Sequence, residues 1–135
     1  MRSRRASPAA VLVAVAVSLG GCGDSGARRD AAADAAVGLL TAVHDRDGTA
    51  ACVLLAPSTI AALEQSMNVG CAEAILDENL PEPGTVRRVD VYGQWARVVL
   101  DDDTLFLAVF RGGWRVASGC RPLGERPYDC VLQGG

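Results

Sequence analysis

The sequence predicts an α+β domain in which N-terminal helices pack on a curved antiparallel sheet. Residues 30–78 are rich in alanine and carry apolar residues at helical spacing. Residues 85–132 instead alternate short β-prone runs with turn residues, and Pro81-Glu82-Pro83-Gly84 separates the two halves. Helices followed by strands is the α+β order, in which the sheet buries one face against the helices.

The first predicted helix covers residues 30–46. Asp30 is a suitable N-cap, because its carboxylate can accept a hydrogen bond from a free backbone N–H of the first turn. Asp47-Gly48 favours the end of the helix. Residues spaced i, i+4, i+7 and i+11 share its apolar face: Ala33, Val37, Leu40 and His44.

Three shorter helices are predicted before the boundary. One covers residues 49–55 and ends before Pro57, and the next covers residues 58–66 with Ser58 as its N-cap. The last covers residues 69–78. Its apolar stripe comprises Cys71, Ala74, Ile75 and Glu78.

The second half is predicted to form a β-meander. Gly93-Gln94 and Gly112-Gly113 are hairpin turns, because glycine accepts the positive φ that such turns require. We interpret Asp101–Asp103 as a solvated turn, since the spaced ligands and glycine of a calcium loop are missing. The predicted strands are residues 85–92, 95–100, 104–110, 114–120 and 128–132.

The first 21 residues have the pattern of an export signal. Three arginines among the first five residues precede an uncharged run over residues 9–19, which is too short to cross about 30 Å of hydrocarbon as an ordinary helix. The run ends in Leu19-Gly20-Gly21-Cys22, which resembles the lipobox of bacterial lipoproteins. The alternative is an ordinary secretory signal with an incidental cysteine.

The lipobox resemblance implies a diacylglyceryl group, with acyl chains such as palmitate, on the Cys22 thiol and cleavage just before it. Residues 1–21 are then a signal peptide, 22–29 a lipidated cysteine with a flexible tether, and 30–135 a single domain. Two or more acyl chains hold a protein stably on a bilayer. We therefore expect a lipid-anchored protein on the extracytoplasmic face of the cell membrane.

The charge of the mature chain argues against nucleic acid as a partner. Removing residues 1–21 leaves 114 residues, with ten arginines against 16 acidic residues and a formal charge of −6. Phosphate binding needs clustered positive charge. We expect no nucleic-acid partner.

Four further cysteines predict two disulfides outside the cytoplasm. We assign Cys52 to Cys71 and Cys120 to Cys130, because each pair then lies within one half of the domain. Pairings between the halves would close longer loops and are not excluded on energy. Zinc sites favour closely spaced cysteine pairs and histidines, and the chain has one histidine, so we expect no metal and no cofactor.

Several segments carry a resemblance over residues 30–132. "AVGLLTAVHDRDGTAAC", "CAEAI", "GGWRVASGC" and "YDC" together resemble small actinobacterial lipoproteins of unassigned function. Their domain resembles the cone-shaped, cystatin-like α+β fold of the nuclear-transport-factor-two-like superfamily. That superfamily includes isomerases, dehydratases and domains without chemistry, so the resemblance does not determine the function.

In enzymes of that superfamily the chemistry sits inside the cone. The polar or aromatic residues that could line such a pocket here are His44, Asp90, Tyr92, Trp95 and Arg97. Strand alternation places Arg88, Asp90 and Tyr92 on the face opposite Val89 and Val91, which also permits an outside location.

Two classes of function follow from these residues. We favour a non-catalytic domain that binds a partner protein or a small apolar ligand, because no recognisable acid–base pair occurs, and we assign no catalytic residue. The alternative is an isomerase-like or dehydratase-like enzyme with a small apolar substrate. A cavity lined by His44 and a carboxylate would favour the enzyme, and a filled cone would favour the binding domain.

Overall fold

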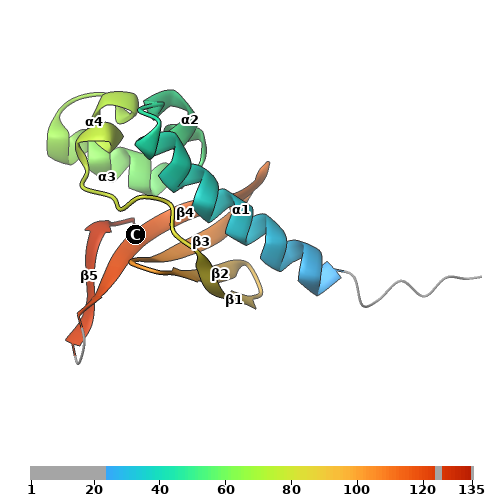
Figure 1. Cartoon of the computed structure of the whole chain (residues 1–135). Helices are drawn as coiled ribbons and strands as arrows, with labels where there is room; N and C mark the ends of the chain where they lie inside the picture. Colours follow the sequence, from blue (N-terminus) through green and yellow to red (C-terminus); the bar gives the residue numbers. More distant parts are fainter. Residues whose placement is uncertain (1–23, 124–125, 135) are drawn as a thin grey trace, which may run out of the picture.

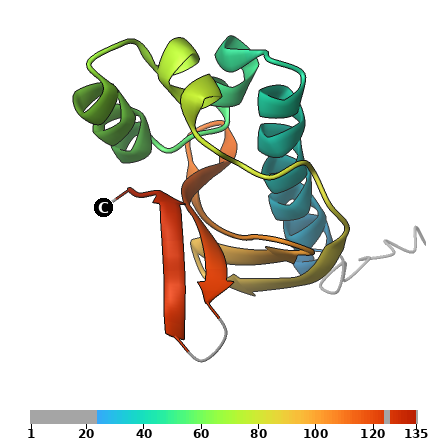
Figure 2. The same ribbon diagram turned by 60° about the vertical axis from the view of Figure 1, so that its left-hand side comes forward.

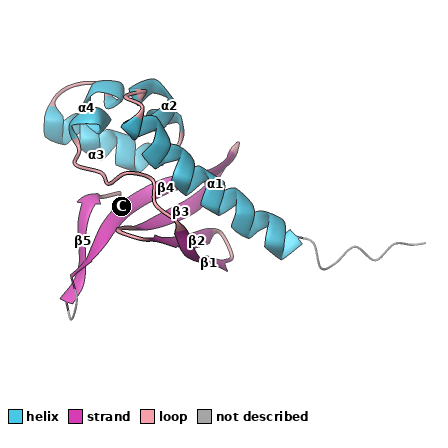
Figure 3. Cartoon of the chain, in the orientation of Figure 1, coloured by secondary structure: helices cyan, strands magenta, loops and turns pink. Residues whose placement is uncertain are grey.

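The chain folds as four helices and an open, five-stranded antiparallel sheet (Figure 1). The first helix packs along one face of the sheet and the third contacts the fourth strand, while the second and fourth helices pack mainly on other helices. The computed structural model describes residues 24–123 and 126–134. Colouring by secondary structure separates the helical half from the strands that follow it in sequence (Figure 3). The predicted α+β class is confirmed.

The helices begin at places that the capping residues did not predict. The first starts at Asp24, so the predicted N-cap Asp30 is wrong and residues 24–29, expected as a flexible tether, are helical. The third begins at Pro57 rather than Ser58, since proline at the first position already has the helical φ. The helices are α1 (Asp24–His44), α2 (Gly48–Val53), α3 (Pro57–Met67) and α4 (Cys71–Asp77).

The sheet is a meander in which each strand pairs with its neighbours along the chain. Gly93, Gly112 and Gly113 have φ values of 55°, 99° and 121°, as the predicted hairpin turns require. The last two strands extend beyond their predicted bounds. The strands are β1 (Val86–Tyr92), β2 (Trp95–Leu100), β3 (Thr104–Phe110), β4 (Gly113–Leu123) and β5 (Arg126–Leu132), in that order across the sheet.

Side chains fill the space between α1 and the sheet. Leu39 and Leu40 of α1 are at most 1% exposed, and the strands opposite contribute equally buried leucines and valines. Figure 2 shows α1 lying across this inner face of the sheet. The buried sheet residues at the centre of the core are Val98, Leu105, Leu107 and Val116.

A short extended segment ties the helical half to β4. The backbone N–H of Val116 donates to Leu54 O at 2.8 Å, and that of Ala56 donates to Val116 O at 2.8 Å. One turn later the Thr59 hydroxyl donates to Ala117 O at 2.6 Å. These contacts therefore provide hydrogen-bond partners for the backbone of Val116 and Ala117, in the part of β4 that does not pair with β5.

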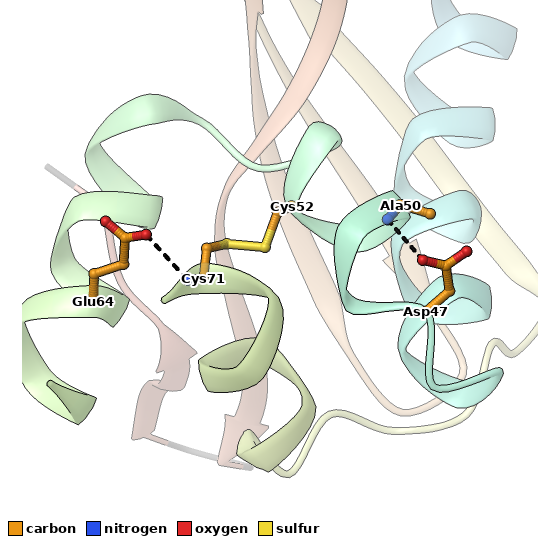
Figure 4. The surroundings of a disulfide bond; sticks show 5 residues. All are labelled: Asp47, Ala50, Cys52, Glu64 and Cys71. Carbon is orange, nitrogen blue, oxygen red and sulfur yellow. Dashed lines mark hydrogen bonds between the residues drawn. A yellow bond between two sulfur atoms is a disulfide. The ribbon is translucent and has the colours of Figure 1, made fainter. Parts of the chain in front are cut away.

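The predicted disulfide pairing is confirmed. Cys52 is bonded to Cys71 with a Cα–Cα distance of 6.2 Å, which joins α2 to α4 (Figure 4). Glu64 of α3 accepts a hydrogen bond from the Cys71 N–H at 3.0 Å. Cys120 is bonded to Cys130, its register partner across β4 and β5.

Candidate functional site

Four of the five predicted pocket residues lie together on the sheet face that α1 does not cover. Asp90 of β1 is the register partner of Arg97 of β2, and Tyr92 is the partner of Trp95. Val89 and Val91 alternate with them and pack against the core, so these four side chains point the other way. We call this surface the outer face; its residues are Arg88, Asp90, Tyr92, Trp95, Arg97 and Phe106.

Asp90 lies on β1, an edge strand of the sheet, and is held between two arginines. Arg97 Nη2 lies 2.7 Å from Asp90 Oδ2, and Arg88 Nε lies 2.9 Å from Asp90 Oδ1. The hydrogen bond from Arg97, followed by that from Arg88, lowers the pKa of Asp90 from its ordinary value. Asp90 is therefore ionised at neutral pH and is poorly suited to act as a general acid.

Two aromatic side chains stand exposed beside this ion cluster. Tyr92 is 62% exposed and Trp95 is 60% exposed, although both are large and partly apolar. They face each other across the first hairpin. Exposed aromatic pairs of this kind, with one polar atom on each ring, are typical of surfaces that contact another molecule.

His44 is separate from the other four residues. It is the last residue of α1, on the helical side of the sheet, and its Nδ1 lies 3.7 Å from Glu82 Oε1. Both side chains are at least half exposed. The predicted five residues thus do not form one pocket, because the sheet separates His44 from the outer face.

Sequence reasoning missed Phe106 and misjudged the acidic turn. Phe106 is the register partner of Arg97, and strand alternation along residues 104–110 would have placed it on the outer face. Asp103 is only 3% exposed and accepts a hydrogen bond from Thr104 N at 3.0 Å, so the prediction of a fully solvated turn is wrong there. Burial raises the pKa of Asp103.

Neighbouring Asp101 has the opposite environment. It accepts a hydrogen bond from Thr85 N at 2.8 Å and pairs with Arg87, and these contacts lower its pKa. The turn therefore joins the start of β1 to the end of β2. It acts as a structural connection.

Within residues 24–123 and 126–134, no group of three or more His, Cys, Asp or Glu side chains is placed to hold a metal ion. None of the helices in this described part combines the length and hydropathy needed to cross a bilayer. Cys22 and the predicted signal lie outside the described residues.

Comparison with protein-family models, with curated proteins and with solved structures finds no match for this chain. Its function therefore has to be inferred from its own residues and geometry.

Proposed function

We propose that the chain is a cell-envelope lipoprotein, anchored to the extracytoplasmic face of the membrane through Cys22, whose domain binds a partner protein through the outer face. The sequence around Cys22 supports the anchor, since a basic and apolar signal ends directly at the cysteine. The two disulfides support an oxidising location outside the cytoplasm.

The observation that carries the binding role is the contrast between the two faces of the sheet. On the inner face, packed leucines and valines occupy the space where a cone-shaped enzyme would hold its substrate. No helix among the described residues covers the outer face, which presents Trp95, Tyr92 and Arg88. Tryptophan, tyrosine and arginine are the residue types most enriched among energetically important interface contacts.

The filled interior also favours a partner protein over a small apolar ligand. A small apolar ligand needs a concave site that removes most of its surface from water. The core residues that would have to line such a site are already in contact with one another. A partner protein does not need a concave site, because it can contact a broad surface, so it fits the outer face better than a small ligand does.

The finer fold assignment, a cone-shaped or cystatin-like domain similar to the nuclear-transport-factor-two-like superfamily, is part of this proposal. The meander that follows the helices and the long α1 across the inner face support it. The enzyme alternative lacks support because His44 and Asp90, the two most plausible acid–base residues, lie on opposite sides of the sheet.

Binding is expected on the face of the sheet rather than at its β1 edge. The pairing of β1 is irregular between Val86 and Arg88, and two arginines occupy this point. A bulge and positive charges on an edge strand discourage another strand from adding there.

Site-specific photo-crosslinking in cells tests the proposal. A photoreactive amino acid replaces Arg88, whose side chain is 64% exposed on the outer face, and in a matched control replaces Ala61, exposed on α3. We expect a discrete protein adduct from position 88 and none of the same mass from position 61. Equal adducts from both positions, or none from position 88 in membranes that retain the protein, would contradict binding through the outer face.

The anchor is tested separately by mass spectrometry of the mature N-terminus. A mature chain that begins at a lipid-modified Cys22 is expected. Cys22→Ala should release the domain from the membrane or leave the signal attached. An unmodified Cys22, or a different first residue, contradicts the anchor whatever the crosslinking shows.

A further inference from the structure

The beginning of α1 is fastened to the hairpin end of the sheet. The Arg28 guanidinium donates a hydrogen bond to Gly93 O and lies 5.5 Å from the centroid of the Trp114 ring. A shared hollow brings the first turns of α1 together with both hairpin turns. Its lining includes Asp24, Arg28, Gly93, Gln94, Gly113 and Trp114. In Figure 1 the start of α1 lies on the same side of the molecule as the β1–β2 hairpin turn.

This end of the domain lies close to the cysteine that would carry the lipid. Only two residue steps separate Cys22 from Asp24, the first residue of α1, and two residues of chain span at most about 7 Å. The helical residues 24–29 replace the flexible tether expected from the sequence. A lipid on Cys22 therefore holds this end, and no other, at the bilayer surface.

The exposed side chains at this end suit the interface of a bilayer. Tyr92 and Trp95 flank the first turn and are 62% and 60% exposed, and Val109 beside the second turn is 36% exposed. Arg29 and Arg111 are exposed at the same end. Tryptophan and tyrosine settle at the headgroup level of membranes, and arginine is attracted to anionic headgroups.

Most acidic groups of the described chain lie away from this end. Asp45 and Asp47 follow the far end of α1, and Asp101–Asp103 form the turn at the other end of the β2–β3 pair. Glu73, Asp77 and Glu78 belong to α4 or its cap. Asp24 and Asp30 of α1 do lie at this end, where Arg28, Arg29 and Arg111 outnumber them. The net negative charge of the mature chain is therefore not concentrated on the end that approaches an anionic surface.

We propose that this end, which we call the rim and which comprises Tyr92, Trp95, Val109, Arg29 and Arg111, docks on the headgroup layer of the bilayer that holds the anchor. The proposal rests on the proposed lipidation of Cys22. The domain then stands with α2, α3 and α4 away from the membrane. The hairpin end of the outer face then meets the headgroups, and a partner protein binds that face beside the membrane, over Arg88, with Tyr92 and Trp95 at the border between the two contacts.

Depth-dependent fluorescence quenching tests the docking without a partner protein. The mature chain is coupled through the Cys22 thiol to maleimide lipids in vesicles of phosphatidylcholine and phosphatidylglycerol, since the other four cysteines are in disulfides. Trp114→Phe leaves Trp95 as the reporter. We expect lipids brominated near the headgroup to quench most of its emission. In the companion variant Trp95→Phe, the buried Trp114, 8% exposed, should be quenched much less.

A matched control changes only the point of attachment. Cys22→Ser combined with Ala61→Cys anchors the same domain through α3, and Trp95 should then lose its quenching. Equal quenching of Trp95 from both anchor points, or none from Cys22, overturns the docking proposal. A free Cys22 thiol in the chain isolated from cells instead removes the anchor itself, so the two failures are distinguished.

Discussion

The same residue type takes three different roles in this chain according to its neighbours. Asp90 is ionised between two arginines on an open surface, and Asp101 is ionised by contacts with Thr85 and Arg87. Asp103, two residues later, is buried, and burial disfavours its charged form. The sequence of the turn does not distinguish Asp101 from Asp103, because the difference in their pKa values comes from the strands that pack around the turn.

These pKa shifts predict opposite responses to pH. Asp103 has a folded-state pKa above its unfolded value, so the wild type loses stability from this group as pH rises from about 4 toward 7. Asp103→Asn removes that loss, and its amide oxygen can still accept from Thr104 N. We expect the stability of the variant relative to the wild type to increase over this range, measured by urea unfolding.

Asp101→Asn is the control from the same turn. The pKa of Asp101 is lowered in the folded state, so its stabilising contribution is present above the unfolded pKa and is lost on acidification. Relative to the wild type, this variant should therefore lose stability as pH rises. Parallel behaviour of the two variants would show that the contrast between Asp101 and Asp103 is incorrect.

Strands were predicted more accurately than helix starts, and the reason lies in the residues that bound each element. Gly93 and Gly112 adopt positive φ, which few other residues tolerate, so the hairpins could be located closely. Asp30 could cap a helix but can also lie inside one, and α1 continues through it. The contacts of Arg28 with Gly93 and Trp114 hold that extra turn, and they become visible only in the folded chain.

The contact between α2 and α4 depends on a glycine. A Cβ at Gly48 would lie 1.9 Å from Ala72 O, a backbone atom that the Cys52–Cys71 bond keeps in place. We expect Gly48→Ala to lower the free energy of unfolding by about 1–3 kcal/mol or more, because overpacking forces the helices apart. Chemical denaturation measures this loss.

Gly70→Ala is the matched control for that substitution. A Cβ at Gly70 would meet no atom within 4 Å, and its φ of −67° is ordinary for any residue. The change should therefore cost less than about 1 kcal/mol. Alanine favours a helix more than glycine does, so propensity alone predicts no loss at either position. A similar loss at both glycines would therefore contradict the contact with Ala72 as the cause.

At the scale of the whole molecule, the sequence predicted the division into halves but not how they are joined. The α+β class and both disulfides followed from residues that act within one half. The pairing of Leu54–Ala56 with Val116 and the contact of Thr59 with Ala117 join residues about 60 positions apart, and no local pattern indicates them. The predicted pocket was incorrect for a related reason, since only the packing of α1 shows on which side of the sheet His44 lies.

This division predicts how the chain behaves when it is cut at the boundary. A specific protease site placed at Glu82, whose side chain is 82% exposed, allows cleavage between the halves. In native buffer the two fragments should stay together, because α1 and the sheet share one hydrophobic core. The hydrogen bonds from the helical half to β4 also join them. In denaturant without a thiol they should separate, because each disulfide lies within one fragment. Gel filtration distinguishes these results: fragments that remain linked in denaturant until a thiol is added contradict the disulfide pairing, and fragments that separate in native buffer contradict a shared core.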